Sequence, residues 1–174
     1  MRASLLCSLA LACAAVSARD AVEYEIAYDD NRPAEATAAA SSTWEVMVRF
    51  KPSGSSWKPL RLRALLAQEG QARWTVYAQD RLEQPGEVLA SWDREYGKDS
   101  ASGPTEGRWV VEDLAARVGG SHSGAVWIGF RGSARLWSSG VDSENAFVRD
   151  ADPARFLKPM QIKKTPMMRL DWAP

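Results

Sequence analysis

The stretch TWEVMVRF, residues 43–50, alternates apolar and charged side chains. Glu45 and Arg49 lie between apolar residues that recur at every second position. A period of two is the pattern of a half-buried strand, because successive side chains of a strand point to opposite faces. We expect Glu45 and Arg49 to face solvent. The side chains expected to face a core are Trp44, Val46, Val48 and Phe50.

The same alternation recurs along the chain, in short segments separated by loops rich in Gly, Ser, Pro and Asp. Many short strands with such connections are typical of an antiparallel sandwich. The sequence therefore predicts an all-β fold, an antiparallel β-sandwich of jelly-roll type with about 8–11 strands. The further strand segments are 22–28, 60–66, 73–79, 87–93, 108–114, 125–131, 134–139, 145–150, 160–164 and 167–172.

Two other segments invite a different interpretation. Residues 33–42 contain good helix formers, but they lack an apolar face, and we predict a surface loop there. Residues 112–118 have the composition for one or two helical turns. The chain shows no linker and no internal repeat, which favours a single domain over residues 19–174.

Residues 1–18 have the layout of a cleaved signal peptide. Arg2 precedes an apolar run over residues 5–16, and small residues lead to Ala18. The run is about a dozen residues, too short to span a bilayer as a helix. We expect a secreted or periplasmic protein. A lipoprotein with a lipid anchor at Cys13 and a buried core helix are the alternatives.

The cysteine and charge content of the chain limits the classes of binding partner that we expect. Removing 18 residues from the 174 leaves 156, and both cysteines, Cys7 and Cys13, leave with the signal. The mature domain would then hold no disulfide. The full chain has 22 acidic and 22 basic residues, so its formal net charge is zero, and it contains no long basic run. We therefore expect no nucleic-acid partner and no membrane span.

Residues 119–130, GGSHSGAVWIGF, contain the chain's single histidine, His122. A nucleophile elbow has serine at the centre of a Gly-x-Ser-x-Gly turn that leads into a helix. Here histidine stands at the centre and a strand pattern follows. One histidine also cannot supply a zinc cluster. We predict a glycine-rich turn between two strands, and no catalytic residue.

Acidic residues gather in two loops. They offer the oxygen ligands that calcium prefers, although no spacing matches a twelve-residue calcium loop. Asp and Asn are also ordinary turn residues, which is the simpler interpretation. We predict no cofactor, and a structural calcium ion is the one alternative that these residues leave open. A carboxylate pair for glycoside cleavage stays open too, but no pair stands out. The candidate calcium ligands are Asp29, Asp30, Asp142 and Glu144.

All eight tryptophans lie in the mature part of the chain. Those within strand patterns are expected in the core: Trp44, Trp74, Trp109 and Trp127. Others lie near loops among polar residues, where an exposed ring covers the apolar face of a sugar and polar neighbours orient its hydroxyls. The alternative is that these rings cap the ends of the sandwich. The candidate ligand-binding residues are Trp92, Asp93, Arg94, Tyr96, Trp57 and Trp137.

An ordered series of loose motifs covers residues 28–149. It resembles a class of exported bacterial β-sandwich modules found beside secreted peptidases and surface-sorting segments. Such modules are similar to galactose-binding-like jelly rolls. The resemblance implies an accessory, non-catalytic role, and it carries over no functional residue. The motifs are Tyr28-Asp29-Asp30, WEVMVRFKP (44–52), KPLRLRALL (58–66), WTVYAQD (74–80), PGEVLASW (85–92), WVVEDL (109–114) and GAVWIGF (124–130).

Three functions follow as hypotheses. The first is a non-catalytic exported protein that binds carbohydrate or another envelope or extracellular protein. The second is a small secreted hydrolase using His122 or a carboxylate pair. The third is a structural subunit of an envelope assembly. We expect the first, and therefore no enzyme.

Overall fold

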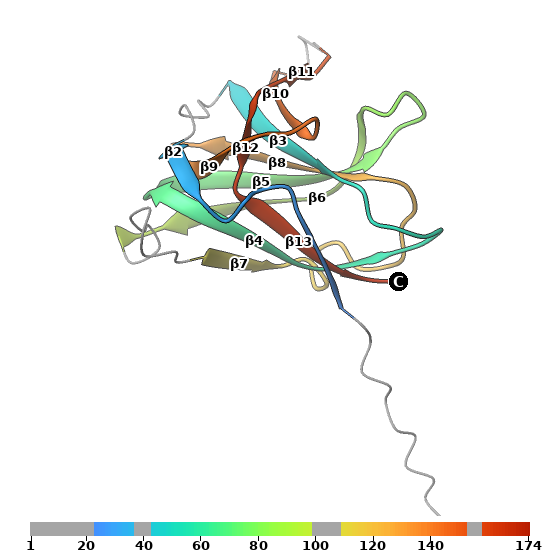
Figure 1. The fold of residues 1–174 in the computed structure, drawn as a ribbon. Coiled ribbons are helices and arrows are strands. Elements are labelled where there is room, and N and C mark those ends of the chain that lie inside the picture. Colours follow the sequence, from blue (N-terminus) through green and yellow to red (C-terminus); the bar gives the residue numbers. More distant parts are fainter. Residues whose placement is uncertain (1–22, 37–42, 99–108, 153–157) are drawn as a thin grey trace, which may run out of the picture.

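A computed structural model describes residues 23–36, 43–98, 109–152 and 158–174. The described chain folds into two antiparallel sheets that face each other (Figure 1). The predicted all-β antiparallel sandwich is therefore confirmed. The predicted signal peptide at 1–18 and the alternative of a lipid anchor at Cys13 concern residues outside the described ranges, as do residues 37–42 of the predicted loop.

The first sheet has seven strands and follows the order β1-β13-β4-β9-β12, with β2 also paired to β9 and β7 to β4. Its strands come from both ends of the chain, and the C-terminal strand lies between β1 and β4. The strands are β1 (Tyr24–Ala27), β2 (Pro33–Ala36), β4 (Lys58–Gln68), β7 (Trp109–Asp113), β9 (Arg135–Asp142), β12 (Lys164–Pro166) and β13 (Met168–Ala173).

The second sheet has six strands in the order β11-β10-β3-β8-β5-β6. Its longest strand pairing is that of β5 with β6, which form a hairpin at one edge of the sheet. The strands are β3 (Trp44–Phe50), β5 (Gly70–Gln79), β6 (Pro85–Tyr96), β8 (Val126–Gly132), β10 (Ala146–Asp150) and β11 (Met160–Gln161).

Every predicted strand segment contains a strand. The described residues hold thirteen strands, more than predicted, because two short edge strands, β2 and β12, flank β9. The loop prediction for 33–42 is thus wrong over Pro33–Ala36. Proline is tolerated there because β2 is an edge strand. Residues 114–118 form one hydrogen-bonded turn, in which the Val118 N–H donates to the Leu114 carbonyl oxygen at 2.9 Å.

The core lies between the two sheets, and its side chains follow the predicted alternation. Val48 and Phe50 of β3 meet Leu62 of β4 and Trp74 of β5 in one buried cluster. Burying such side chains is the main stabilising contribution in a chain of this kind, about 2 kcal/mol for each large apolar side chain. Each sheet therefore has an inner face toward this core and an outer face away from it.

Two predictions for β3 are wrong. Trp44 is 38% exposed, since it lies at the very start of the strand, opposite Asp150 at the end of β10. Glu45 was expected in solvent, yet it is 2% exposed on the outer face. Its neighbour Met47 is also buried there, in a small cluster with Tyr77 and Trp127. The outer face of the six-stranded sheet is thus partly covered.

Within the described ranges, no helix is long and apolar enough to cross a membrane.

Candidate ligand-binding face

The outer face of the six-stranded sheet carries a row of charged side chains from five adjacent strands. Arg149 of β10 lies opposite Glu45 of β3. Arg73 of β5 lies opposite Arg131 of β8 on one side and Asp93 of β6 on the other. Because β8 lies between β3 and β5, these residues form a continuous line across the sheet. The charged row is Arg149, Glu45, Arg131, Arg73 and Asp93.

Glu45 is the buried member of the row, and three contacts hold it. The Tyr77 hydroxyl lies 3.0 Å from Oε1 and 3.1 Å from Oε2, and Arg149 donates its Nε–H to Oε2 at 2.9 Å. Gly129 lies beneath the carboxylate, where an added Cβ atom would be 2.1 Å from Oε1. A buried carboxylate is tolerated only when it is paired and hydrogen-bonded, and these contacts meet that requirement.

The Tyr77 side chain is held at its hydroxyl by Glu45 and at its ring by Arg149. Burial, and then the charge of Glu45, raise the pKa of the Tyr77 hydroxyl to about 12, so it stays protonated and donates its hydrogen at neutral pH. The guanidinium carbon of Arg149 lies 4.4 Å from the centre of the Tyr77 ring, a cation–π contact. Glu45, Tyr77 and Arg149 therefore form one mutually supported unit, which we call the Glu45 triad.

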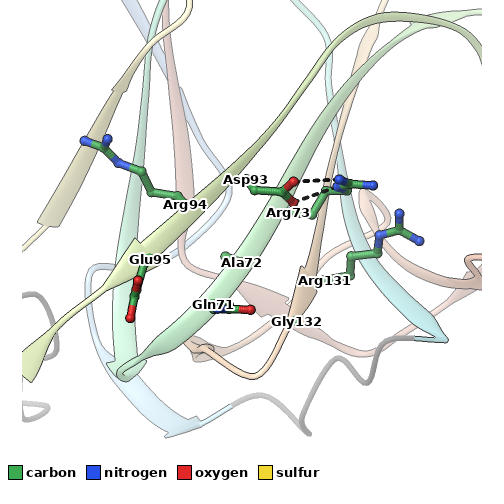
Figure 2. A pocket seen from close by; sticks show the side chains of 8 residues that line it. All are labelled: Gln71, Ala72, Arg73, Asp93, Arg94, Glu95, Arg131 and Gly132. Carbon is green, nitrogen blue, oxygen red and sulfur yellow. Dashed lines mark hydrogen bonds and ion pairs between the residues drawn. The ribbon is translucent and has the colours of Figure 1, made fainter.

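Two hollows lie along the charged row. A cavity of about 320 Å³ is lined by the Glu45 triad, Val88, Arg131 and five further residues. These five are Pro85 and Gly86 of β6, Asp150 at the end of β10, and Ala151 and Asp152 that follow it. A wider hollow of about 590 Å³ is lined by Arg73, Asp93 and again Arg131 (Figure 2). Arg131 thus belongs to the wall of both hollows. The row and its hollows are the candidate ligand-binding face.

Arg73 and Arg131 of the row differ in their contacts with carboxylates. Arg73 holds Asp93 with two parallel bonds, Nε to Oδ1 at 2.7 Å and Nη2 to Oδ2 at 2.6 Å. The hydrogen bonds from Arg73 lower the pKa of the Asp93 carboxyl. Arg131 is half-exposed and makes no hydrogen bond or ion pair with any residue that the structure describes. Figure 2 shows Arg73 and Arg131 extending to the same side of the sheet.

The predicted ligand cluster at residues 92–96 is divided between the two faces of β6. Asp93 lies on the outer face, whereas Trp92 and Tyr96 are buried between the sheets. Arg94 also points away from Asp93 (Figure 2), and its Nε lies 3.4 Å from the Glu112 carboxylate. The expectation of an exposed Trp92 is therefore wrong. Alternation along a strand sends neighbouring residues to opposite faces.

Glu112 of β7 organises the inner part of that cluster. Its carboxylate accepts the Trp92 indole N–H at 3.0 Å and the Tyr96 hydroxyl at 2.7 Å. The Trp74 indole N–H donates to the Tyr96 oxygen at 2.8 Å. Burial, followed by the hydrogen bond to Glu112, raises the pKa of the Tyr96 hydroxyl. Sequence reasoning missed this network, which joins an edge strand of each sheet.

The burial of the other tryptophans depends on which face of its strand each one occupies. Trp57 is 1% exposed, and its indole N–H donates to the Gly124 carbonyl oxygen at 2.7 Å, so the expectation of an exposed ring is wrong. Trp137 is half-buried on β9. Trp74 and Trp127 are buried as predicted, although Trp127 belongs to the small outer-face cluster. Trp109 is half-buried under the Arg169 guanidinium, 4.4 Å away.

His122 lies in a turn, as predicted. Its backbone N–H and carbonyl oxygen both pair with Trp57 at 2.8 Å. Its Nε2 lies 2.8 Å from the Gly119 carbonyl oxygen, and its ring packs 5.2 Å from the Trp57 ring. Gly119, Gly120 and Gly124 have positive φ angles of 58°, 66° and 73°, which favour glycine. The histidine therefore packs against the loop, and its Nε2 contacts a backbone carbonyl oxygen.

The candidate calcium ligands have other partners. Both oxygens of Asp29 accept hydrogen bonds from Arg169, at 3.1 and 2.5 Å. Asp30 accepts the Arg32 backbone N–H at 3.0 Å. Asp142 pairs with β12 at the end of β9, and Glu144 lies in the turn that follows. Among the described residues, no group of three or more His, Cys, Asp or Glu is arranged to hold a metal.

The two buried glutamates do not form a catalytic pair. Glu45 points outward from the six-stranded sheet, whereas the Glu112 carboxylate lies between the sheets against Trp92 and Tyr96. The six-stranded sheet separates them. A pair for glycoside cleavage must flank one bond from the two sides of a single site.

A scan of the chain against protein-family models gives no match, and a search among curated proteins gives none either. The resemblance to exported sandwich modules therefore stays a prediction.

Proposed function

We propose that this protein is an exported, non-catalytic binding module that recognises carbohydrate on the outer face of the six-stranded sheet. The observation that carries the proposal is the buried Glu45 carboxylate on an outer sheet face, at the wall of a hollow of about 320 Å³. Export follows from the signal-peptide pattern of residues 1–18, and the accessory role from the resemblance to sandwich modules.

The Glu45 triad supports recognition of hydroxyl groups. Glu45 orients Tyr77 and Arg149, and these side chains line the hollow with polar atoms in fixed positions. Binding sites gain affinity when donors and acceptors are held in place before the ligand arrives. Strands are rigid supports for such groups. A sugar, which presents several hydroxyls at fixed spacing, matches a polar hollow of this size.

The first experiment fills the hollow without disturbing the core. Val88 lines it and is 52% exposed. Val88→Trp should abolish retention of the purified mature protein on insoluble polysaccharide. The matched control is Val111→Trp, on the outer face of the seven-stranded sheet, where valine is also 52% exposed. That variant should bind as the unsubstituted protein does. Equal binding by both variants, or no retention of the unsubstituted protein, would contradict the proposal.

A protein partner is the second candidate, because exposed apolar side chains flank the hollow. Leu82 is 79% exposed and lines a neighbouring hollow together with Pro85 and Arg149. Exposed apolar groups beside a polar site are common where proteins dock. Capture of a single defined envelope protein by the immobilised domain, lost in Leu82→Asp, together with no retention on polysaccharide, would favour this candidate.

A further inference from the structure

Among the described residues of the row, Arg131 is the arginine without a carboxylate in hydrogen-bond contact, although its charge contributes to the lowered pKa of Asp93. Arg149 pairs with Glu45, and Arg73 pairs with Asp93. These two pairs cancel, so the row keeps one positive charge, on Arg131. Its position between Glu45 and Arg73 places that charge in the wall shared by both hollows.

The arrangement has a cost for the folded protein. Arg73 and Arg131 lie directly opposite each other on neighbouring strands. Like charges in that position destabilise a sheet. Asp93 occupies only the Nε and Nη2 side of Arg73. An oxyanion above the pair would satisfy Arg131 and approach the remaining Nη1 side of Arg73. Local conflicts that cost stability are expected at functional sites.

We infer that Arg131, with Arg73 beside it, binds the carboxylate of an acidic sugar, so that the ligand of this face is an acidic polysaccharide. This inference rests on the proposed function and names its ligand class. Guanidinium groups bind carboxylates through two parallel hydrogen bonds, a geometry that a neutral sugar cannot offer. Because Arg131 lines both hollows, a sugar ring held there by its carboxylate would be next to the hollow at the Glu45 triad.

Neighbouring charges define the controls. Glu95 is exposed on the outer face of β6, opposite Gln71 and two residues from Asp93. Both Asp93 and Glu95 contribute negative charge to the wider hollow, but only Asp93 occupies a guanidinium of the row. Arg32 is exposed in the loop after β1 and serves as an arginine outside the row.

The experiment measures binding of a galacturonate oligomer and of a galactose oligomer of equal length to the mature protein. The acidic oligomer should bind more tightly, and the difference should shrink at high salt. Arg131→Gln should weaken acidic binding about tenfold or more, the size of a lost charge-assisted pair. Arg32→Gln should leave it unchanged. The midpoint of thermal unfolding of Arg131→Gln should be no lower than that of the unsubstituted protein.

A second pair of variants tests the part of Arg73. Asp93→Asn frees the Arg73 guanidinium and should raise affinity for the acidic oligomer more than Glu95→Gln does. Equal increases would show that only the general charge matters, and would overturn the shared role of Arg73.

The outcomes separate the two proposals. Equal binding of both oligomers, unchanged in Arg131→Gln, overturns this inference and leaves carbohydrate recognition standing. Binding of neither oligomer, with no retention on any polysaccharide, overturns the proposed function itself. Binding of inorganic phosphate, lost in Arg131→Gln, with no binding of galacturonate, would assign the site to a phosphate-bearing ligand and overturn the acidic-sugar assignment.

Discussion

The outer faces of the two sheets use the same residue types in different ways. On the seven-stranded sheet, Asp171 accepts hydrogen bonds from Arg61 at 3.1 Å and from Arg63 at 2.7 Å. The same arginines continue to Glu23 and Glu25 of the first strand and its flank. Each charge in this network has an opposite charge beside it. On the six-stranded sheet, Arg131 of the charged row makes no ion pair with a described residue, and its charge acts on Asp93 only through space.

The difference also concerns depth. The arginines of the seven-stranded face are 48% and 30% exposed, so water can replace a lost partner. The Glu45 carboxylate is 2% exposed, and water cannot reach it as easily. The Asp171 side chain is 9% exposed, but it has two arginine partners, so the loss of one leaves it paired. The second network, around Glu45, is a buried site in which each contact contributes to stability. Equivalent substitutions on the two outer faces should therefore lower the free energy of unfolding by different amounts.

The largest expected effect comes from removing the partner of Glu45. Arg149→Gln leaves a buried carboxylate without its cation, and should lower the free energy of unfolding by about 3 kcal/mol. Arg61→Gln on the other outer face should cost less than about 1 kcal/mol, because Arg61 is 48% exposed and Asp171 keeps its hydrogen bond from Arg63. Urea unfolding of both variants measures the difference. Equal losses would show that the two faces do not differ as described.

The glycine beneath Glu45 should give the next effect. Gly129→Ala places a Cβ atom where the Glu45 carboxylate lies, and should cost about 2 kcal/mol through displacement of that side chain. Gly140 of β9 is the matched control, since an added Cβ there meets nothing closer than 3.7 Å. Gly140→Ala should change the stability by less than about 0.5 kcal/mol. A tolerated Gly129→Ala would argue against a packed Glu45 triad.

The smallest effect is a difference in alkaline stability. The pKa of Tyr77 lies near 12 in the folded protein, above its ordinary value of 10.0, so the folded state keeps the proton longer than the unfolded chain. This contribution is complete below pH 10 and is lost as the pH rises toward 12. Tyr28 and Tyr96 shift in the same direction. Tyr77→Phe should therefore show a shallower, but not flat, decline of stability across that range. If the stability of Tyr77→Phe declined with pH in the same way as that of the unsubstituted protein does, the Tyr77 hydroxyl would not contribute to the pH dependence.

The sequence predicts the sandwich well because period-two alternation is a local signal. The inner positions of β3, Val46, Val48 and Phe50, are buried as expected. Turn chemistry is local too, and the glycines around His122 take the positive φ angles that the loop needs. The strand content and the glycine-rich loop around His122 could therefore be predicted from the sequence.

The candidate site could not be read from the sequence, since it depends on register between distant strands. Glu45 meets Arg149 and Tyr77 only after β3, β10, β8 and β5 are ordered in one sheet. The predicted cluster at Trp92, Asp93 and Tyr96 failed for the opposite reason. Closeness in sequence suggested one surface, while strand alternation places these residues on two faces. One available signal was missed: Gly129 inside a strand indicates close approach of another group.

The measurement closest to the central claim is a map of amide chemical-shift changes as an acidic oligosaccharide is added to the labelled mature domain. Contact with the Glu45 hollow should shift resonances of β3, β5, β6, β8 and β10, with the greatest changes beside Arg131. If the shifts fall instead on β1, β4 and β13, the ligand lies on the lattice of Arg61, Arg63 and Asp171, and our assignment of the two faces is reversed.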